Sequence, residues 1–193
     1  MSPRMIVVAG PPGSGKSSVF PVASFGVASF NADDRGSELN AGSYVRIPKH
    51  IRTVVNREFE AFVLGCIERR SSFALETTLR SSVTFDQAAL ARAAGFTTEM
   101  RYLALRDLSM HIERVKARAD AGGHSASETT LRGIYNSSLA NLPRAIAEMD
   151  DLWVYDNSPV GGPPRLLLEG EKGTIRFLAE EPPDWLTRAL DWY

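Results

Sequence analysis

The chain carries very few side chains that could form disulfides or bind a structural metal. Among its 193 residues there are one cysteine, Cys66, and three histidines. A single cysteine cannot form an internal disulfide, so the sequence favours a reducing compartment, and we expect a cytoplasmic protein. The histidines show no ligand spacing with cysteine or carboxylates, and we therefore expect no structural zinc.

The chain also lacks a strong net charge and a long apolar run. Its 22 Lys and Arg and 23 Asp and Glu leave a formal net charge of −1. Without a basic field, we expect no nucleic-acid partner and no membrane partner. The apolar run at residues 5–9 stops at Gly10, which is too short for a signal-peptide core. No stretch approaches the roughly 18 apolar residues of a transmembrane helix.

What the chain does contain is an alternation of short apolar strands and amphipathic helices. Its composition, 44% hydrophobic and 23% charged, is typical of globular proteins. Strands are expected at residues 5–9, 27–30, 73–75, 97–105 and 152–155. Helices are expected at residues 48–70, 84–94, 108–121 and 127–142, with residues 143–149 as an extension. This order predicts an α/β fold with a mainly parallel sheet flanked by helices.

The last part of the chain breaks this alternation. After "SPVGGPP" at residues 158–164, the sequence predicts a hairpin that turns at residues 171–173 and then a closing helix. This tail is too small for a core of its own. We therefore expect one domain over residues 1–193, with a core at about residues 4–158 and a C-terminal appendage at about residues 159–193.

A glycine-rich loop follows the first strand. Residues 10–17, "GPPGSGKS", match the Walker A pattern G-x-x-x-x-G-K-[ST] in its required place between a strand and a helix. Glycines let backbone N–H groups face phosphate oxygens, Lys16 adds charge for the β- and γ-phosphates, and Ser17 offers a hydroxyl to Mg²⁺. Pro21 predicts that the helix is short. The expected nucleotide-binding residues are Gly10, Pro11, Pro12, Gly13, Ser14, Gly15, Lys16, Ser17 and Ser18.

Among nucleotide-binding proteins, the remaining motifs favour a small kinase over a GTPase. Residues 33–36 match D-x-x-G weakly, and the chain has no N-K-x-D guanine-binding motif. Asp33 follows the second strand, where a carboxylate can accept the proton of a substrate hydroxyl and orient it toward a γ-phosphate. The alternative is that Asp33 and Asp34 only form a turn.

Arginines follow in a segment that is typical of a lid. Arg114 and Arg118 are one helical turn apart, and Arg132 comes after the glycine pair at residues 122–123. Arginines there can neutralise the charge that phosphoryl transfer spreads over oxygens. Solvated helix charge is the alternative interpretation.

The pentapeptide ETTLR occurs twice, at residues 76–80 and 128–132. The first copy ends an apolar strand, so we expect Glu76 and Thr77 to lie beside the phosphate loop and to bind the acceptor substrate there. The second follows "HSAS", in which Ser125 and Glu128 form the capping-box pattern S-x-x-E, so we expect Glu128 to cap a helix.

Together these motifs resemble the zeta-toxin family of P-loop kinases. The matching pieces, in family order over about residues 4–158, are "GPPGSGKSS", "FNADD", "FALETTLR", "RVKARADAGGH", "TLRGIYNSSLANL" and "VYDNS". The resemblance implies a P-loop NTPase fold with a helical lid. It implies transfer of the γ-phosphate of ATP to a hydroxyl of a small molecule, such as the sugar nucleotide UDP-N-acetylglucosamine, and an antitoxin-like protein partner.

The resemblance also assigns roles to residues. It implies that Lys16 and Ser17 hold ATP and Mg²⁺ and that Asp33 is the base. It implies that the acceptor pocket and the triphosphate clamp are formed by further side chains, namely Glu60, Glu76 and Arg80 for the pocket and Arg118 and Arg132 for the clamp. The lid departs from the family pattern at "SAS" (residues 125–127) and at Gly133. Two alternatives therefore stay open: a kinase for another hydroxylated metabolite or antibiotic, and a nucleotide-binding interaction module without catalysis.

Overall fold

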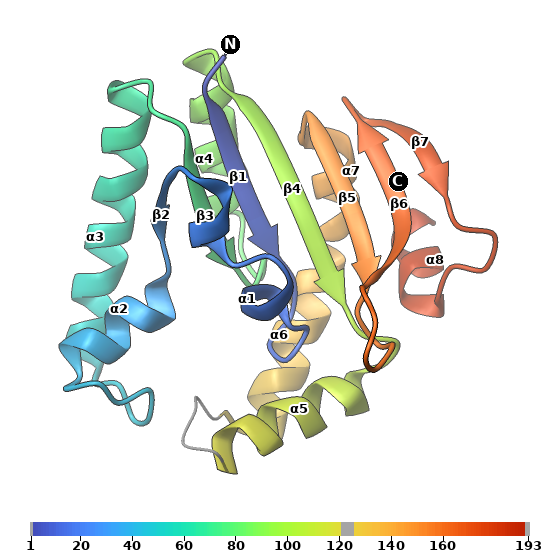
Figure 1. The fold of residues 1–193 in the computed structure, drawn as a ribbon, viewed down its shortest axis with the longest axis horizontal. Helices are drawn as coiled ribbons and strands as arrows, with labels where there is room; N and C mark the ends of the chain where they lie inside the picture. The colour runs from blue at the N-terminus through green and yellow to red at the C-terminus, as the bar shows by residue number, and fades with distance from the viewer. Residues whose placement is uncertain (1, 121–125, 192–193) are drawn as a thin grey trace.

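A mixed sheet of seven strands forms the centre of the protein. The computed structural model describes residues 2–120 and 126–191. The strand order is β2-β3-β1-β4-β5-β6-β7 (Figure 1). The first five strands in the chain run parallel and the last two pair antiparallel. The strands are β1 Arg4–Ala9, β2 Ala28–Phe30, β3 Phe73–Thr77, β4 Thr97–Ala104, β5 Asp151–Asp156, β6 Arg165–Glu171 and β7 Thr174–Leu178. The predicted α/β class with a mainly parallel sheet is confirmed.

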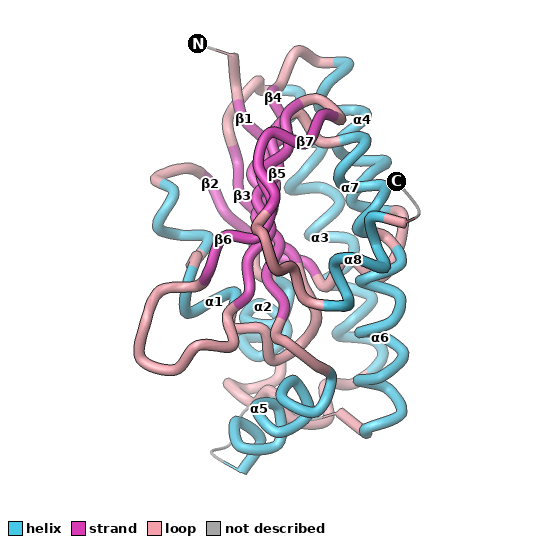
Figure 2. Tube along the Cα trace, turned by 90° about the vertical axis from the view of Figure 1, so that its right-hand side faces the viewer, coloured by secondary structure: helices cyan, strands magenta, loops and turns pink. Residues whose placement is uncertain are grey.

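Most helices cover one face of this sheet. Figure 2 shows α3, α4, α6, α7 and α8 on one side, and α1 with the neighbouring 3₁₀ turn on the other. The larger buried cluster lies under the first group, and a smaller one built on Ile6, Val8 and Leu103 lies under the second. The helices are α1 Lys16–Val19, a 3₁₀ turn Val22–Phe25, α2 Ala32–Leu39, α3 Lys49–Glu68, α4 Val83–Ala93, α5 Leu108–Asp120, α6 Glu128–Ala140, α7 Leu142–Glu148 and α8 Asp184–Leu190.

The central strand and the helix after it follow the sequence-based expectation. In β1, the residues from Met5 to Ala9 have no exposed surface, as expected for a parallel strand covered on both faces. Helix α1 has four residues and is capped at Phe20, directly before Pro21. A proline at that place cannot continue the helix, so the predicted short first helix is confirmed.

One helix was not predicted. Helix α2 begins after Asn31, whose Oδ1 accepts hydrogen bonds from the backbone N–H groups of Asp33 (3.0 Å) and Asp34 (3.3 Å). The buried residues of α2 are Gly36 and Ser37, so it has no apolar stripe from which periodicity could reveal it. Asp33 consequently lies in the first turn of a helix, where the helix dipole favours negative charge.

The C-terminal tail packs into the main core. Strand β6 pairs with β5 and β7 pairs with β6, so the predicted hairpin extends the central sheet. Leu168 in β6 and Leu186 in α8 are completely buried. The ring of Trp185 lies 6.4 Å from the ring of Tyr102 in β4. The tail therefore shares its apolar contacts with the rest of the chain.

No described helix is both long enough and apolar enough to cross a membrane.

We expect Leu186→Ala to lower the free energy of unfolding by about 2–5 kcal/mol, because it leaves a cavity in the shared core. The matched control is Leu90→Ala, since Leu90 lies on α4 and is 52% exposed; it should change stability by no more than about 0.5 kcal/mol. Urea unfolding measures both values. A single transition in the wild type and a large loss only at Leu186 would show that the tail folds with the sheet, whereas equal small losses would contradict this.

Candidate functional site

The candidate site lies at the carboxyl edge of the parallel strands. The glycine-rich loop follows β1, Asn31 follows β2, Glu76 is the last residue but one of β3, and Asn157 follows β5. In open α/β sheets this edge is where ligands bind. The strand order therefore brings together side chains that are up to about 140 residues apart in the sequence, as in the contact between Ser14 and Asn157.

The backbone of the phosphate loop requires its glycines. Gly10, Gly13 and Gly15 have φ angles of 140°, 80° and 89°. A Cβ at Gly13 would lie 2.6 Å from the carbonyl oxygen of His111, and one at Gly15 would overlap the amide of Asn157. The loop is thus pressed against α5 and against the end of β5, with no space for side chains at these positions.

Hydrogen bonds hold the loop in this shape. The N–H of Gly10 donates to the carbonyl of Thr77 at 3.2 Å. The side chain of Asn157 donates to the carbonyl of Ser14 at 2.8 Å, and Arg114 donates to the carbonyl of Asn157 at 3.0 Å. Thr77 was expected to bind the substrate that receives the phosphate. In the structure its carbonyl accepts the hydrogen bond from Gly10, and its hydroxyl accepts a hydrogen bond from the N–H of Leu79.

His111 braces the same loop and was missed at the level of sequence. Its Nε2 accepts from the N–H of Leu105 at 3.0 Å, so Nδ1 carries the proton and donates to the carbonyl of Pro12 at 2.8 Å. The side chain is 2% exposed, and burial lowers the pKa of His111 to about 4. The histidine is therefore neutral at physiological pH. The surrounding sequence "RDLSMHIERV" contains no motif that marks this histidine. Its contacts become visible only in the folded structure.

Lys16 lies inside the loop with its ammonium folded onto backbone oxygens. Its Nζ donates to the carbonyls of Gly10 at 2.8 Å and Pro11 at 3.2 Å. Burial lowers the pKa of Lys16, while the negative charges of Glu76 and Asp33 oppose that shift. These carbonyl contacts keep a nearly buried cation paired until an anion binds.

Two serines in the loop have features that fit a bound nucleotide. The Oγ of Ser14 is completely buried and has no hydrogen-bond partner within the described ranges, so a phosphate oxygen in the loop would satisfy it. The Oγ of Ser17 donates to Oε2 of Glu76 at 2.9 Å. The loop and its serines thus fit the phosphates of ATP.

Magnesium also fits this set of residues. Mg²⁺ is usually held by one or two protein oxygens, with phosphates and waters completing its octahedron. The Ser17 hydroxyl and the Glu76 carboxylate provide such oxygens next to the loop. The described residues contain no cluster of three or more His, Cys, Asp or Glu side chains that could hold a metal by itself.

The predicted catalytic side chains divide into those near Lys16 and those elsewhere. Asp33 is exposed, yet close enough to Lys16 for its charge to raise the pKa of that lysine. Arg118, exposed on α5, lowers the pKa of Lys16 through its positive charge. Arg132 lies on α6 and forms an ion pair with Glu128 at 3.4 Å. Asp33 and Arg118 thus both influence the charge of Lys16, and Arg132 is paired within its own helix.

The capping box predicted for the second ETTLR copy is wrong. Ser127 is the N-cap of α6, and its Oγ accepts from the N–H of Thr130 at 3.2 Å. Glu128 is the first residue of the helix rather than the third, and it pairs with Arg132 and, at 4.0 Å, with Lys116. Ser125 lies outside the described residues.

Glu60 and Arg80 are exposed, and no hydrogen bond or ion pair between described residues joins either of them to the phosphate loop. On α3 it is Glu58 that forms a close contact, an ion pair of 2.6 Å with Arg35 of α2. The roles of Glu60 and Arg80 at the acceptor therefore stay predictions.

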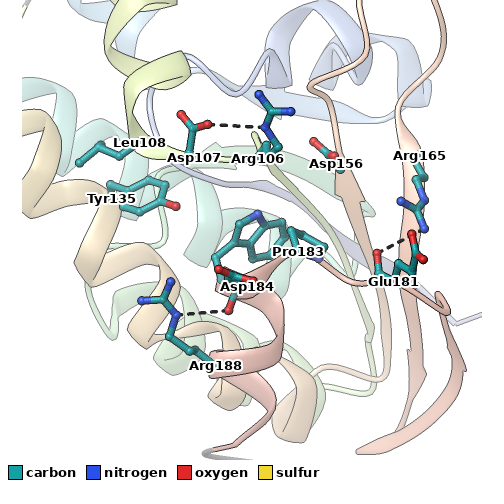
Figure 3. Close-up of a pocket in the computed structure, with 11 residues that line it drawn as sticks. Arg106, Asp107, Leu108, Tyr135, Asp156, Arg165, Glu181, Pro183, Asp184 and Arg188 are labelled. Carbon is teal, nitrogen blue, oxygen red and sulfur yellow. Dashed lines mark hydrogen bonds and ion pairs between the residues drawn. The ribbon is translucent and has the colours of Figure 1, made fainter.

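A separate hollow of about 590 Å³ lies beside the site, between the start of α5, α6 and α8 (Figure 3). Its lining includes side chains of both charges, with Arg106 paired to Asp107 at 3.6 Å. Asp107 also accepts from the N–H of Met110 at the start of α5. No residue of the phosphate loop lines this hollow, so it is distinct from the phosphate-binding site.

Neither a protein-family model nor a curated protein matches the chain, but solved structures do. A candidate kinase from Chloroflexus aurantiacus J-10-fl matches with a TM-score of 0.55 and 16% identity, over 70% of this chain and 79% of that chain. A chain of the AvrRxo1-ORF1:ORF2 complex with ATP matches with a TM-score of 0.68 and 15% identity, over 90% of this chain and 60% of that chain. A chain of the PezAT toxin-antitoxin system of Streptococcus pneumoniae matches with a TM-score of 0.60 and 17% identity, over 81% of this chain and 68% of that chain.

These matches define the fold. The chain shares the fold of these structures, an α/β fold with a phosphate loop after its first strand, and this agrees with the P-loop NTPase fold that the zeta-toxin resemblance implied. It spans about 60% of the length of the matched AvrRxo1 chain.

We expect the free energy of unfolding to fall less steeply with decreasing pH in the His111→Gln variant than in the wild type. The folded-state pKa of His111, about 4, is below the usual 6.5, so the unfolded chain binds a proton that the folded chain does not. This histidine therefore lowers the free energy of unfolding as pH falls from 6.5 toward 4, by about 2 kcal/mol between pH 7 and pH 5. Glutamine keeps one donor and one acceptor but does not titrate. Urea unfolding of both proteins at the two pH values isolates the difference, and parallel losses would contradict the neutral buried histidine.

Proposed function

We propose that this chain is an ATP-dependent kinase that transfers the γ-phosphate to a hydroxyl of a small molecule. The observation that carries the proposal is the arrangement around Lys16. A phosphate loop with an unsatisfied Ser14 hydroxyl lies at the same sheet edge as an exposed carboxylate, Asp33, and an exposed arginine, Arg118. Phosphoryl transfer needs little more than positioning and charge stabilisation, and these groups supply both.

The donor half of the site is built in advance. The loop is braced by His111 and Asn157, so its N–H groups need not reorganise when phosphates bind. The ammonium of Lys16 can exchange the carbonyls of Gly10 and Pro11 for phosphate oxygens. Mg²⁺ bound near Ser17 would neutralise charge on the β- and γ-phosphates.

The acceptor half depends on helix α2. Asp33 is held in the first turn by the Asn31 cap, and α2 is tied to α3 by the ion pair between Arg35 and Glu58. An exposed carboxylate on this fixed element can accept the proton of an incoming hydroxyl and orient its oxygen. The influence of Arg118 on the pKa of Lys16 supports a role for this arginine in balancing charge on the transferred group, and Arg132 is proposed as a second arginine that would first leave Glu128.

The acceptor and the partner are proposed at the level of class. The zeta-toxin resemblance supports a sugar nucleotide such as UDP-N-acetylglucosamine as acceptor, with Glu60 and Arg80 at its pocket. Two of the matched structures come from assemblies, the AvrRxo1-ORF1:ORF2 complex and the PezAT toxin-antitoxin system. They support an antitoxin-like partner for this chain, and the sequence supports the cytoplasm as its location.

We expect the wild-type protein, given ATP, Mg²⁺ and a metabolite extract, to form a new phosphorylated product detectable by mass spectrometry. The Lys16→Ala variant should form none, because it lacks the cation that binds the β- and γ-phosphates. Calorimetry should show that it binds ATP at least tenfold more weakly. Tight ATP binding by the wild type without any product would favour the interaction module instead.

We expect Asp33→Asn to slow transfer by about 10²–10⁴-fold while the affinity for ATP changes little, because only the proton acceptor is lost. The matched control is Asp34→Asn. Asp34 is the neighbouring exposed carboxylate and accepts a hydrogen bond from the hydroxyl of Tyr44 at 2.9 Å. Single-turnover rates measure transfer and calorimetry measures ATP binding. Transfer at the wild-type rate by Asp33→Asn would exclude Asp33 as the base.

A further inference from the structure

We propose that the hollow between the start of α5, α6 and α8 binds a small zwitterion, an amino acid with a large apolar side chain. The hollow measures about 590 Å³, which is a size typical of small-molecule sites. Figure 3 shows charged side chains around it from β5, β6, α8 and the segment between β4 and α5. No residue of the phosphate loop lines it, so this site goes beyond the proposed kinase reaction and does not depend on it.

One polar atom in the lining lacks a hydrogen-bond partner. Trp185 lines the hollow and is 5% exposed, and its Nε1 is buried with no partner among the described residues. A buried N–H group without an acceptor costs free energy. A carboxylate oxygen of a ligand would remove this cost after a small shift of the lining, because Nε1 is closed to water in the free protein.

Two arginines of the lining are also available to a carboxylate. Arg165 and Arg188 are exposed, and neither forms an ion pair within the described part of the chain. Arg165 donates to the backbone carbonyl of Glu181 at 3.4 Å. Arg188 donates to the backbone carbonyl of Asp184 at the same distance. A guanidinium group can exchange one such long contact for two parallel hydrogen bonds to a carboxylate.

The lining also offers a carboxylate to a positive charge on the ligand. Asp156, the last residue of β5, accepts from the N–H of Ser158 at 2.8 Å and forms no ion pair with another described residue. In all, three arginines and four carboxylates line the hollow. An anion alone would therefore meet repulsion as well as attraction, whereas a ligand with both charges can pair with both sets.

Aromatic and apolar side chains form the rest of the wall. Tyr135 on α6 is half-buried, and its ring lies 5.2 Å from the ring of His111, which fixes its place. Leu108 and Pro183 also line the hollow. Burial of an apolar group against these side chains favours a large amino acid over glycine.

The test compares L-phenylalanine with two analogues that each lack one charge. Phenylpropanoate lacks the ammonium group, and phenethylamine lacks the carboxylate. We expect each analogue to bind the wild-type protein at least tenfold more weakly than L-phenylalanine, because a charged group of the site is then left without its partner. Calorimetry measures the affinities. In NMR spectra, L-phenylalanine should shift the indole N–H signal of Trp185, which is identified by its absence in Trp185→Phe.

Two variants separate the two charges of the site. Asp156→Asn keeps the acceptor for Ser158 but removes the negative charge. We expect it to bind L-phenylalanine about tenfold more weakly and phenylpropanoate with unchanged or higher affinity. Arg188→Gln should weaken the binding of both molecules. The matched control is Arg176→Gln, since Arg176 is exposed on β7, pairs with Glu171 and does not line the hollow; it should bind both as the wild type does.

A last comparison separates this site from the nucleotide site. Lys16→Ala should bind L-phenylalanine as the wild type does, and saturating ATP should not displace L-phenylalanine from the wild type. Displacement by ATP would assign the hollow to the nucleotide and overturn the inference. Equal affinities for L-phenylalanine and phenylpropanoate, or no binding of L-phenylalanine at about 10 mM, would also overturn it, and both are measured on the wild type even if a variant fails to fold. Failure of the wild type to form a phosphorylated product would contradict only the proposed function.

Discussion

The site depends on one steric constraint: the backbone of the phosphate loop touches its neighbours so closely that side chains cannot fit between them. A Cβ on Gly10, Gly13 or Gly15 would meet Leu103, His111 or Asn157. Because these three residues belong to β4, α5 and the segment after β5, the loop adopts its shape only when those elements are in place. His111 and Asn157 then orient the loop, because they donate hydrogen bonds to the carbonyls of Pro12 and Ser14. Two carbonyls of the loop, those of Pro12 and Ser14, are thereby fixed to neighbouring elements.

Within this frame the charges of the site balance one another in the absence of ligand. Lys16 is almost buried, and such a cation is unstable unless it has partners. Backbone carbonyls and Glu76 supply them, and Asp33 and Arg118 modify the potential from the solvent side. A nucleotide with Mg²⁺ brings charges of both signs to the same place. It can replace these internal contacts without leaving Lys16 or Glu76 unpaired.

The sequence predicted what depends on local pattern. A continuous apolar run, a glycine loop and Pro21 were sufficient for β1, the phosphate loop and a short α1. Helix α2 was not predicted, because its buried residues are Gly36 and Ser37 and it therefore has no periodic pattern of apolar residues. The contacts of His111, and the packing of Trp185 onto Tyr102, join residues of different elements, and no local signal marks them. The phosphate loop, Asp33 and Glu76 follow or end strands whose order carries them to one edge of the sheet. Glu60, Arg80 and Arg132 depend on tertiary positions that motif spacing does not determine.

The two ETTLR copies show the same limit within a single chain. Five identical residues are a strand end in one place and a helix start in the other. In the first copy the glutamate reaches across to another element and binds Ser17, while in the second it binds Arg132 four residues later in its own helix. The preceding residues decide the difference: "FAL" forms a buried strand next to β1, and Ser127 caps a helix. The pentapeptide contributes a carboxylate in both places, and the fold decides whether that carboxylate contacts the phosphate loop or the basic side chains of Arg132 and Lys116.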